Sequence, residues 1–410
     1  MLVGATLGAG VLGACAPQGQ TGTGAASTSA SAPQAEAESQ SAAAEVSAQA
    51  SSAATSATQQ EASSGQPASS SATGEVDVAK TFPSWNPSSA SLAKLIDYVK
   101  DVTDKGSPNY VEPEERLATF DMDGTLMSEK APVYVDYCLL FHRVFDDPTY
   151  QAPAEYVEIC QQLRANADRG IVDTSLDDAK NATLVGAFKD MAPEEFREYV
   201  TSFIDTVSAE GFEGMTYGQS IYKPMAEVVD YLRANEFEVY IVSACEREVA
   251  RAIGVSKLDV EPDHIIGTDY GTKATGQGEQ AANEYTLEEG DELVFDGTKA
   301  LEVAKLNKVV YIEREIGKRP LLAFGNSSGD YAMLNYAQDN PDRPGMGLLV
   351  ICDDLEREYG DAERAAKQVG EAAEAGWTTF SMANDWATIY GQGVTKTQLV
   401  ADAQELAQAA

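Results

Sequence analysis

Short apolar runs recur along the chain and are separated by longer amphipathic stretches. Apolar runs of this length, flanked by turn residues, predict buried β-strands. The predicted strands are residues 117–120, 238–242, 264–267, 321–324 and 347–352. Apolar residues at helical spacing predict helices over residues 92–99, 154–168, 193–207, 224–235 and 301–316. Because strands alternate with helices, the pattern predicts an α/β domain built on a parallel sheet.

The alternation is interrupted by one long helical block. Residues 128–222 are mostly amphipathic and lie between the first two predicted strands. We therefore interpret them as a helical domain inserted after the first strand, which leaves residues 80–127 and 223–410 for the core. Residues 268–298 are polar and Gly-rich, and they contain one predicted hairpin arm at 292–295.

The N-terminal part has a different composition. Residues 16–79 are almost wholly Ala, Ser, Gln, Thr, Gly and Glu, without an aromatic residue, so they predict a disordered linker. Residues 1–14 are small and apolar and precede Cys15. Leu-Gly-Ala-Cys at 12–15 resembles the lipobox of bacterial lipoproteins, which implies cleavage before Cys15, its lipidation, and anchoring to the outer face of the cell membrane. Because no Lys or Arg precedes the apolar run, an uncleaved leader with an incidental cysteine is the alternative.

Charge and composition exclude several classes of function. The chain has 65 Asp and Glu against 29 Lys and Arg, a net charge of −36, which argues against nucleic acid and anionic lipid as partners. No apolar run is long enough for a conventional transmembrane helix, so membrane contact is expected only through the lipid anchor. Five cysteines without a Cys-x-x-Cys pair, and only two histidines, argue against a disulfide scaffold and a zinc site. The oligomeric state has no signal in the sequence.

The strongest chemical signal follows the first predicted strand. Asp121 and Asp123 stand in the sequence Asp-Met-Asp-Gly-Thr, which ends at Thr125. Two carboxylates this close raise the pKa of one of them unless a cation is present. One could then act as a nucleophile and the other as an acid or base. The alternative is an ordinary turn, since Asp and Gly are common turn residues.

Polar residues also follow two later strands. Ser243 could donate a hydrogen bond to a phosphoryl oxygen, although a serine in this place is more often a helix cap. Lys308 or Lys318 could bring a cation to a phosphate, or could be a solvated charge. Asn326 and Asp330, in a Gly- and Ser-rich turn, offer oxygen ligands for Mg²⁺. Because ligands bind at the carboxyl ends of strands in open α/β sheets, these residues predict a single site.

The order of these motifs resembles that of the haloacid dehalogenase-like (HAD) phosphatases. The resemblance covers about residues 95–391. The sequences at 308–327, 357–359 and 381–386 are similar to the branch that contains phosphorylcholine and phosphoserine phosphatases. Membership of that branch implies a Rossmann-like parallel sheet, with residues 128–222 as a helical cap over the active site.

The resemblance implies a Mg²⁺-dependent phosphatase of small phosphomonoesters. Asp121 would be the nucleophile that forms an aspartyl-phosphate, and Asp123 would protonate the leaving group and then activate water. Thr125 would orient the loop, while Ser243 and Lys308 would bind the phosphoryl group. The implied metal ligands are Asp121, the backbone carbonyl of Asp123, Asn326 and Asp330.

Two features leave alternatives open. HAD phosphatases of this branch usually have Asp where Asn326 stands and Asn where Gly329 stands, so one negative charge is lost and more of the metal site is expected to rest on Asp330. Lys318 is the alternative to Lys308 as the phosphate-binding lysine. The second carboxylate, Asp123, argues against a dehalogenase. A catalytically inactive HAD-like lipoprotein that binds a ligand at the cell surface is the alternative function.

Overall fold

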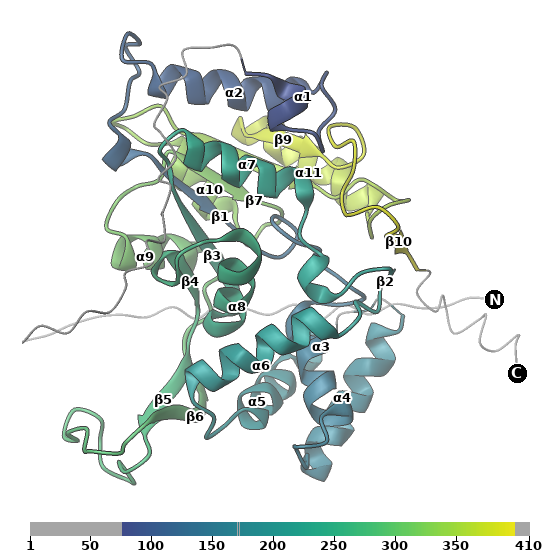
Figure 1. Ribbon diagram of the computed structural model, residues 1–410, viewed down its shortest axis with the longest axis vertical. Helices are drawn as coiled ribbons and strands as arrows, with labels where there is room; N and C mark the ends of the chain where they lie inside the picture. Colours follow the sequence, from purple (N-terminus) through teal and green to yellow (C-terminus); the bar gives the residue numbers. More distant parts are fainter. Residues whose placement is uncertain (1–75, 170, 172, 398–410) are drawn as a thin grey trace, which may run out of the picture. The chain divides into compact units, whose positions relative to one another are not determined.

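The computed structural model describes residues 76–169, 171 and 173–397. Cys15 and nearly all of the predicted linker lie outside the described residues, so the predictions made for them stay predictions. Among the described residues, six parallel strands form the central sheet in the order β4-β3-β1-β7-β8-β9 (Figure 1). Their bounds are β1 Leu117–Phe120, β3 Glu238–Glu246, β4 Ile265–Thr268, β7 Leu322–Gly325, β8 Met346–Ile351 and β9 Thr378–Ser381. The predicted α/β fold with a Rossmann-like parallel sheet is confirmed.

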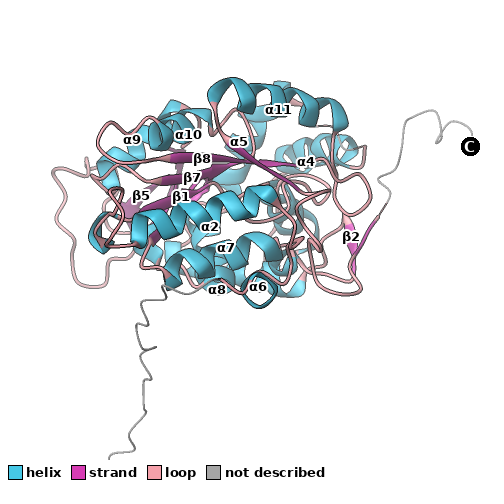
Figure 2. Cartoon of the chain, turned by 90° about the horizontal axis from the view of Figure 1, so that it is seen from above, coloured by secondary structure: helices cyan, strands magenta, loops and turns pink. Residues whose placement is uncertain are grey.

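Helices cover both faces of this sheet (Figure 2). One face carries α2 Ala90–Thr103, α7 Lys223–Ala234 and α8 Arg247–Leu258. The other face carries α9 Leu306–Glu315, α10 Tyr331–Gln338 and α11 Ala362–Ala375. Apolar side chains of the central strands alternate between the two layers, as the pleat of a strand requires. Phe120 and Phe324 face the α2 layer and stack with ring centroids 4.1 Å apart, whereas Ala323 faces the α9–α11 layer.

The strand β1 is buried along its whole length because it lies inside the sheet, between β3 and β7. Leu117, Ala118, Thr119 and Phe120 are all inaccessible to solvent. Ala118 pairs with Val239 of β3 on one side and Leu322 of β7 on the other. A continuous apolar run without polar alternation is typical of an interior parallel strand. This position places the residues that follow Phe120 at the middle of the carboxyl edge of the sheet.

The chain between β1 and α7 is mainly helical. It contains α3 Val135–Phe141, α4 Ala154–Ala167, α5 Asp177–Ala187 and α6 Pro193–Thr206, which lie together in the lower part of Figure 1. Their apolar faces form one core: Phe188 packs on Phe196 at 4.6 Å, and Phe203 stacks on Tyr217 at 4.9 Å. These side chains are continuous with the apolar core on the α2 face of the sheet.

A hairpin from the second half of the chain joins these helices. Strands β5 Tyr270–Ala274 and β6 Leu293–Lys299 pair in the antiparallel sense. The backbone of Phe295 exchanges hydrogen bonds of 2.9 Å with Asp190 and Met191, which follow α5. The sequence predicted the hairpin arm, and we assigned it to the core with the rest of residues 223–410. The structure instead packs it on the inserted helices, because Phe295 and Tyr270 complete their aromatic core around Phe196.

Strands β3 and β9 and helix α11 are among the elements that differ from the sequence prediction. Strand β3 extends past Val242 to Glu246, because a register shift lets Glu246 pair with Thr268 of β4. Strand β9 was not predicted, since its sequence Thr-Thr-Phe-Ser is largely polar. The strand lies at an edge of the sheet. Helix α11 was not predicted either; it begins at the N-cap Asp361 and ends at Gly376, which has a φ of +78°.

One short pair of strands connects the C-terminal part to the inserted region, and an N-terminal segment packs on the core sheet. β2 Phe212–Glu213 pairs with β10 Thr395–Lys396 in the antiparallel sense. The N-terminal turn α1 Val78–Thr81 leads to Trp85, which packs on Phe380 of β9 with centroids 4.9 Å apart.

Within the described part of the chain, no helix is both long and apolar enough to cross a bilayer.

Candidate active site

Asp121 is the first residue beyond β1, and the loop that follows it turns sharply. Its N–H donates to the carbonyl of Phe324 at 2.9 Å, which continues the pairing of β1 with β7. Thr125 donates its hydroxyl to Asp121 Oδ2 at 3.2 Å. Gly124 has a φ of +78°, and a Cβ on it would lie 1.8 Å from Asn326 Nδ2. The loop therefore needs glycine both for its backbone conformation and for the approach of Asn326.

Lys308 of α9 is the cation at this loop. Its side chain is buried, and its Nζ lies 2.5 Å from Asp121 Oδ1 and 2.8 Å from Asp330 Oδ1. The same ammonium donates to the carbonyl of Val242 at 2.7 Å. Lys318, the alternative from the sequence, donates instead to the carbonyl of Glu114 at 2.7 Å. The structure thus brings Lys308, and not Lys318, to Asp121.

Asp330 holds the loop after β7 and the lysine together. Its Oδ2 accepts the N–H groups of Asn326 and Ser327 at 2.9 and 3.0 Å. Its Oδ1 pairs with Lys308. Both oxygens of Asp330 are therefore engaged within the loop and with Lys308. The side chain of Asn326, by contrast, faces Gly124.

Ser243 lies inside β3, not just beyond it as the sequence indicated. It is fully buried, and its Oγ accepts the N–H of Cys245 at 3.1 Å. The preceding residue, Val242, carries the carbonyl that accepts from Lys308. A hydroxyl that accepts from a backbone N–H keeps its own proton for donation. Ser243 can therefore donate toward a group bound beside Asp121.

Burial and neighbouring charge raise the pKa values of both carboxylates in the loop. Burial, and then the nearby Asp330, raise the pKa of Asp121 to about 7, although Lys308 opposes this shift. Burial raises the pKa of Asp123 well above its ordinary range, and the charges of Asp121, Asp136 and Glu129 add to this effect. Burial acts to lower the pKa of Lys308, but Asp121 and Asp330 outweigh it and raise that pKa. The ammonium thus stays charged, while Asp123 favours its protonated form.

The donor atoms of this loop suit Mg²⁺ better than a transition metal. Within the residues that the structure describes, no cluster of three His, Cys, Asp or Glu side chains could hold a metal ion alone. Oδ1 of Asp123 and Nδ2 of Asn326, however, are buried without a hydrogen-bond partner in that same part of the chain. An amide turned by half a revolution exchanges its nitrogen for its oxygen. One carboxylate, a carbonyl and an amide oxygen, completed by water, match the preference of Mg²⁺.

Two residues next to this loop were missed by sequence reasoning. Glu129 lies five residues beyond Gly124 and forms a two-point ion pair with Arg364 of α11, at 2.7 and 3.1 Å. Gln368, one turn further along α11, donates to the carbonyl of Asn326 at 2.6 Å. A prediction of α11 would have placed Arg364 and Gln368 on one helix face. Nothing in the sequence pairs Arg364 with Glu129.

The start of the inserted helices carries polar side chains close to Asp123. Lys180 of α5 lies 2.8 Å from Asp136 of α3 and 4.4 Å from the ring centroid of Tyr137. Tyr134 donates its hydroxyl to Glu129 at 3.3 Å. Glu129 is the member of this group nearest the loop, because a Cβ on Gly124 would lie 3.1 Å from that of Glu129. The charges of Glu129 and Asp136 both add to the raised pKa of Asp123.

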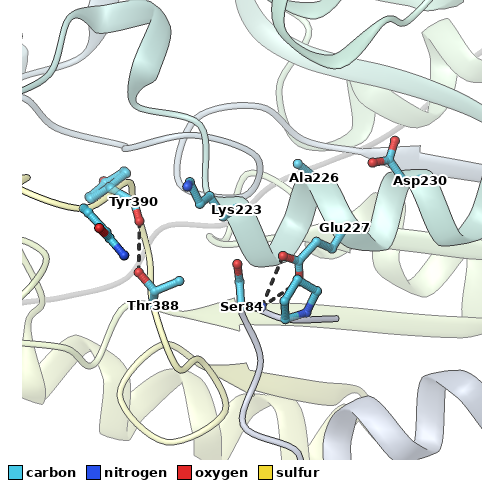
Figure 3. Close-up of a pocket in the computed structure, with 9 residues that line it drawn as sticks. Ser84, Lys223, Ala226, Glu227, Asp230, Thr388 and Tyr390 are labelled. Carbon is cyan, nitrogen blue, oxygen red and sulfur yellow. Dashed lines mark hydrogen bonds between the residues drawn. The ribbon is translucent and has the colours of Figure 1, made fainter. Parts of the chain in front are cut away.

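A surface groove of about 530 Å³ lies apart from these residues (Figure 3). Lys223, Glu227 and Asp230 of α7 form one side, and Thr388 and Tyr390 form the other. The carboxylate of Glu227 accepts the N–H of Ser84, which lines the same groove, at 3.1 Å. None of the residues that line it belongs to the Asp121 cluster, so the groove is a separate feature.

The parallel sheet carries the Asp-Met-Asp-Gly-Thr loop and the buried lysine at its carboxyl edge, as enzymes with an open α/β sheet carry their sites. The model of the haloacid dehalogenase-like hydrolase family matches residues 118–335, more than half of the chain. The chain belongs to this family.

No curated protein matches the chain significantly, but several solved structures are similar to it. A protein of unknown function from Bordetella pertussis Tohama I is 18% identical, with a TM-score of 0.42, over 65% of this chain and 98% of that one. A functionally unknown protein from Anaerococcus prevotii DSM 20548 is 14% identical, with a TM-score of 0.44, over 71% and 91%. A phosphoserine phosphohydrolase-like protein from Francisella tularensis subsp. tularensis SCHU S4 is 14% identical, with a TM-score of 0.34, over 63% and 98%.

Proposed function

We propose that this hydrolase is a Mg²⁺-dependent phosphatase that cleaves small phosphomonoesters through an aspartyl-phosphate on Asp121. The observation that carries the proposal is the buried triad in which Lys308 lies between Asp121 and Asp330. An isolated buried lysine would lose its charge, and isolated buried carboxylates would be protonated. The triad keeps a cation beside a carboxylate in a site that excludes water. A fixed cation at this place, joined by a divalent cation that offsets the net negative charge of the triad, suits a phosphoryl group, whose transferring oxygens carry negative charge.

The residues divide the reaction into two steps. In the first step, a carboxylate oxygen of Asp121 attacks phosphorus, and the bond from phosphorus to the leaving oxygen breaks. Asp123 gives its proton to that oxygen, a role that its raised pKa supports. In the second step, Asp123 takes a proton from water, which attacks phosphorus and releases phosphate from Asp121. Ser243 donates a hydrogen bond to a phosphoryl oxygen in both steps. Lys308, whose three donors already serve Asp121, Asp330 and Val242, offsets the charge of the phosphoryl group.

We assign the metal to the side of the loop that faces Asn326. Asp121, the carbonyl of Asp123 and the amide oxygen of Asn326 would hold it, while Asp330 fixes Asn326 and Lys308 in place. Bound Mg²⁺ would neutralise charge on the phosphoryl oxygens and on the attacking carboxylate.

We propose phosphorylcholine- or phosphoserine-like esters as the substrates. The aromatic rings of Tyr134 and Tyr137 lie beside Glu129, whose carboxylate is paired with Arg364. Aromatic faces attract an ammonium group, which choline and serine esters both carry. We also propose that Cys15 anchors the chain to the outer face of the cell membrane, so that the substrates are extracellular.

The test is phosphate release from a panel of phosphomonoesters by the full chain, with and without Mg²⁺, beside the variant Asp121→Asn. Mg²⁺-dependent release that the variant lacks would support the phosphatase, and the order of the esters would rank the leaving groups. Equal release by both proteins, or none by either, would reject the assignment. In the second case a binding protein on an inactive hydrolase fold would replace it.

A further inference from the structure

Helix α11 holds the loop after β7 from outside the triad. Gln368 donates to the carbonyl of Asn326 at 2.6 Å, and Arg364 donates to the same carbonyl at 3.4 Å. The two side chains are four residues apart and so project from one face of the helix. The backbone of Asn326 is thereby fixed on one side by α11 and on the other by Asp330, which accepts its N–H.

The guanidinium of Arg364 also connects this loop to the chain that leaves the catalytic loop. It donates to Glu129 Oε2 at 2.7 Å and to Oε1 at 3.1 Å, the two-point geometry that suits a carboxylate. Glu129 is close to Gly124, because a Cβ on Gly124 would lie 3.1 Å from that of Glu129. A single arginine therefore spans from the Asn326 loop to the Asp121 loop.

The side chain of Asn326 has an unusual position. It is 3% exposed, faces Gly124, and its Nδ2 lacks a hydrogen-bond partner among the described residues. A buried amide without a partner costs free energy, so the fold must hold it there against that cost. The amide faces the loop that carries Asp121 and Asp123, where its oxygen would meet a cation.

We infer that Arg364 and Glu129 are positioning residues of the metal site, which fix Asn326 against Gly124. An amide oxygen carries no net charge and so attracts Mg²⁺ less strongly than a carboxylate would. Its contribution then depends on being held at the right place before the metal binds. The two-point ion pair, together with Gln368, supplies that restraint. The inference rests on the proposed function only in requiring that the same site binds a divalent cation.

The experiment measures Mn²⁺ binding to the full chain by electron paramagnetic resonance, which does not depend on turnover. Arg364→Gln and Glu129→Gln should each weaken Mn²⁺ binding about tenfold or more, as removal of outer supports of a metal site does. The double variant should be no weaker than either single one, because the two residues act as one unit. In the activity assay, the Mg²⁺ concentration for half-maximal rate should rise by the same factor.

The matched control is Arg197→Gln, which breaks the pair of Arg197 with Glu248 at 2.6 Å. Its side chains are 33% and 8% exposed, against 31% and 12% for Arg364 and Glu129. Glu248 keeps a second partner, Arg251 at 2.7 Å, so the control should lose no more stability than Arg364→Gln does. The control should bind Mn²⁺ as the wild type does. Thermal unfolding without metal shows which variants are folded, and if Arg364→Gln is not, Glu129→Gln decides.

Unchanged Mn²⁺ affinity in a folded Glu129→Gln variant would overturn the inference, as would an equal loss in Arg197→Gln. A wild type that binds no Mn²⁺ would overturn it too. Weaker binding in the two variants beside a wild type that hydrolyses no ester would uphold the inference while rejecting the proposed phosphatase.

Discussion

The Nζ atom of Lys308 lies 2.5 Å from Oδ1 of Asp121, although 187 positions of sequence separate the two residues. The pair is buried, and Asp330 adds a second carboxylate at 2.8 Å. Two carboxylates against one ammonium leave the cluster with a net negative charge. A divalent cation at the same loop would reverse that balance, which explains why phosphate binding at this site should require one.

Replacement of Asp121 tests the nucleophile. Asp121→Asn removes the attacking carboxylate but keeps the shape of the side chain, so turnover of every phosphomonoester should be abolished. The measurement is phosphate release in saturating Mg²⁺, with folding of the variant checked by circular dichroism. Residual turnover above a thousandth of the wild-type rate in pure variant protein would show that another group attacks phosphorus.

Replacement of Asp123 tests the acid. Asp123→Asn should slow hydrolysis of alkyl phosphates by about 10²–10⁴-fold, because the leaving alkoxide then departs without a proton. The first step with an aryl phosphate should suffer much less, since a phenolate is a stable leaving group. A rapid-mixing experiment should therefore show a burst of phenolate from the variant. Equal losses for alkyl and aryl esters in that first step would contradict an acid role for Asp123.

Loss of the lysine should destabilise the fold. Lys308→Met leaves Asp121 and Asp330 buried without their cation, which should cost about 3–5 kcal/mol in the free energy of unfolding. Urea denaturation measures the change. Lys318→Met is the control, because the ammonium of Lys318 is exposed at the surface and should change stability by less than about 0.5 kcal/mol. A loss in Lys308→Met as small as the one expected for Lys318→Met would mean that the triad adds nothing to the stability of the fold.

A carboxylate at position 326 should strengthen the metal site. Asn326→Asp adds a negative charge where the amide now faces Gly124, so Mg²⁺ should bind about tenfold more tightly. The gain in stability from the metal-free to the Mg²⁺-saturated protein should then be about 1.4 kcal/mol larger in the variant than in the wild type. Without metal the variant should be less stable than the wild type, because the added charge is buried. Thermal unfolding across a Mg²⁺ titration checks both directions. A smaller rise in Tm than in the wild type would contradict Asn326 as a ligand.

Glu358, a buried acid outside the triad, should make the stability of the fold depend on pH. Burial raises the pKa of Glu358 from 4.5 to about 7 in the folded chain. Between these values the folded protein holds a proton that the unfolded chain has released, so stability falls as the pH rises from about 4.5 to 7. The change should be about 3 kcal/mol.

The variant Glu358→Gln should remove the Glu358 contribution to this dependence, because an amide does not titrate. Its oxygen can accept the N–H of Tyr359, while its NH₂ group can donate to the hydroxyl of Tyr390. Asp121, Asp123 and Glu246, whose pKa values are also raised, keep their own contributions. Denaturation at pH 5 and pH 8 compares the two proteins. The variant should be the more stable one at pH 8, whereas an unchanged difference between the two pH values would show that Glu358 is ionised throughout.

Much of the fold was legible in the sequence because interior parallel strands are short, apolar and bounded by turns. Strands β1, β7 and β8 and helices α4, α6 and α7 lie close to their predicted positions. Strand β9 was missed because an edge strand does not need a continuous apolar run. The end of β3 was missed because Ser243, Cys245 and Glu246 read as polar loop residues, whereas pairing with β4 keeps them extended.

The sequence alone determined the family and pointed to the loop, since Asp121, Asp123 and Thr125 lie within five residues of one another. It could not choose between Lys308 and Lys318, because both are lysines near one helix and only the direction of the side chain separates them. It gave no indication of the pair formed by Arg364 and Glu129, which are 235 positions apart. Short-range motifs can be read from sequence because backbone geometry relates their residues directly. Contacts between distant elements depend on how helices pack on the sheet, and only the tertiary structure decides that.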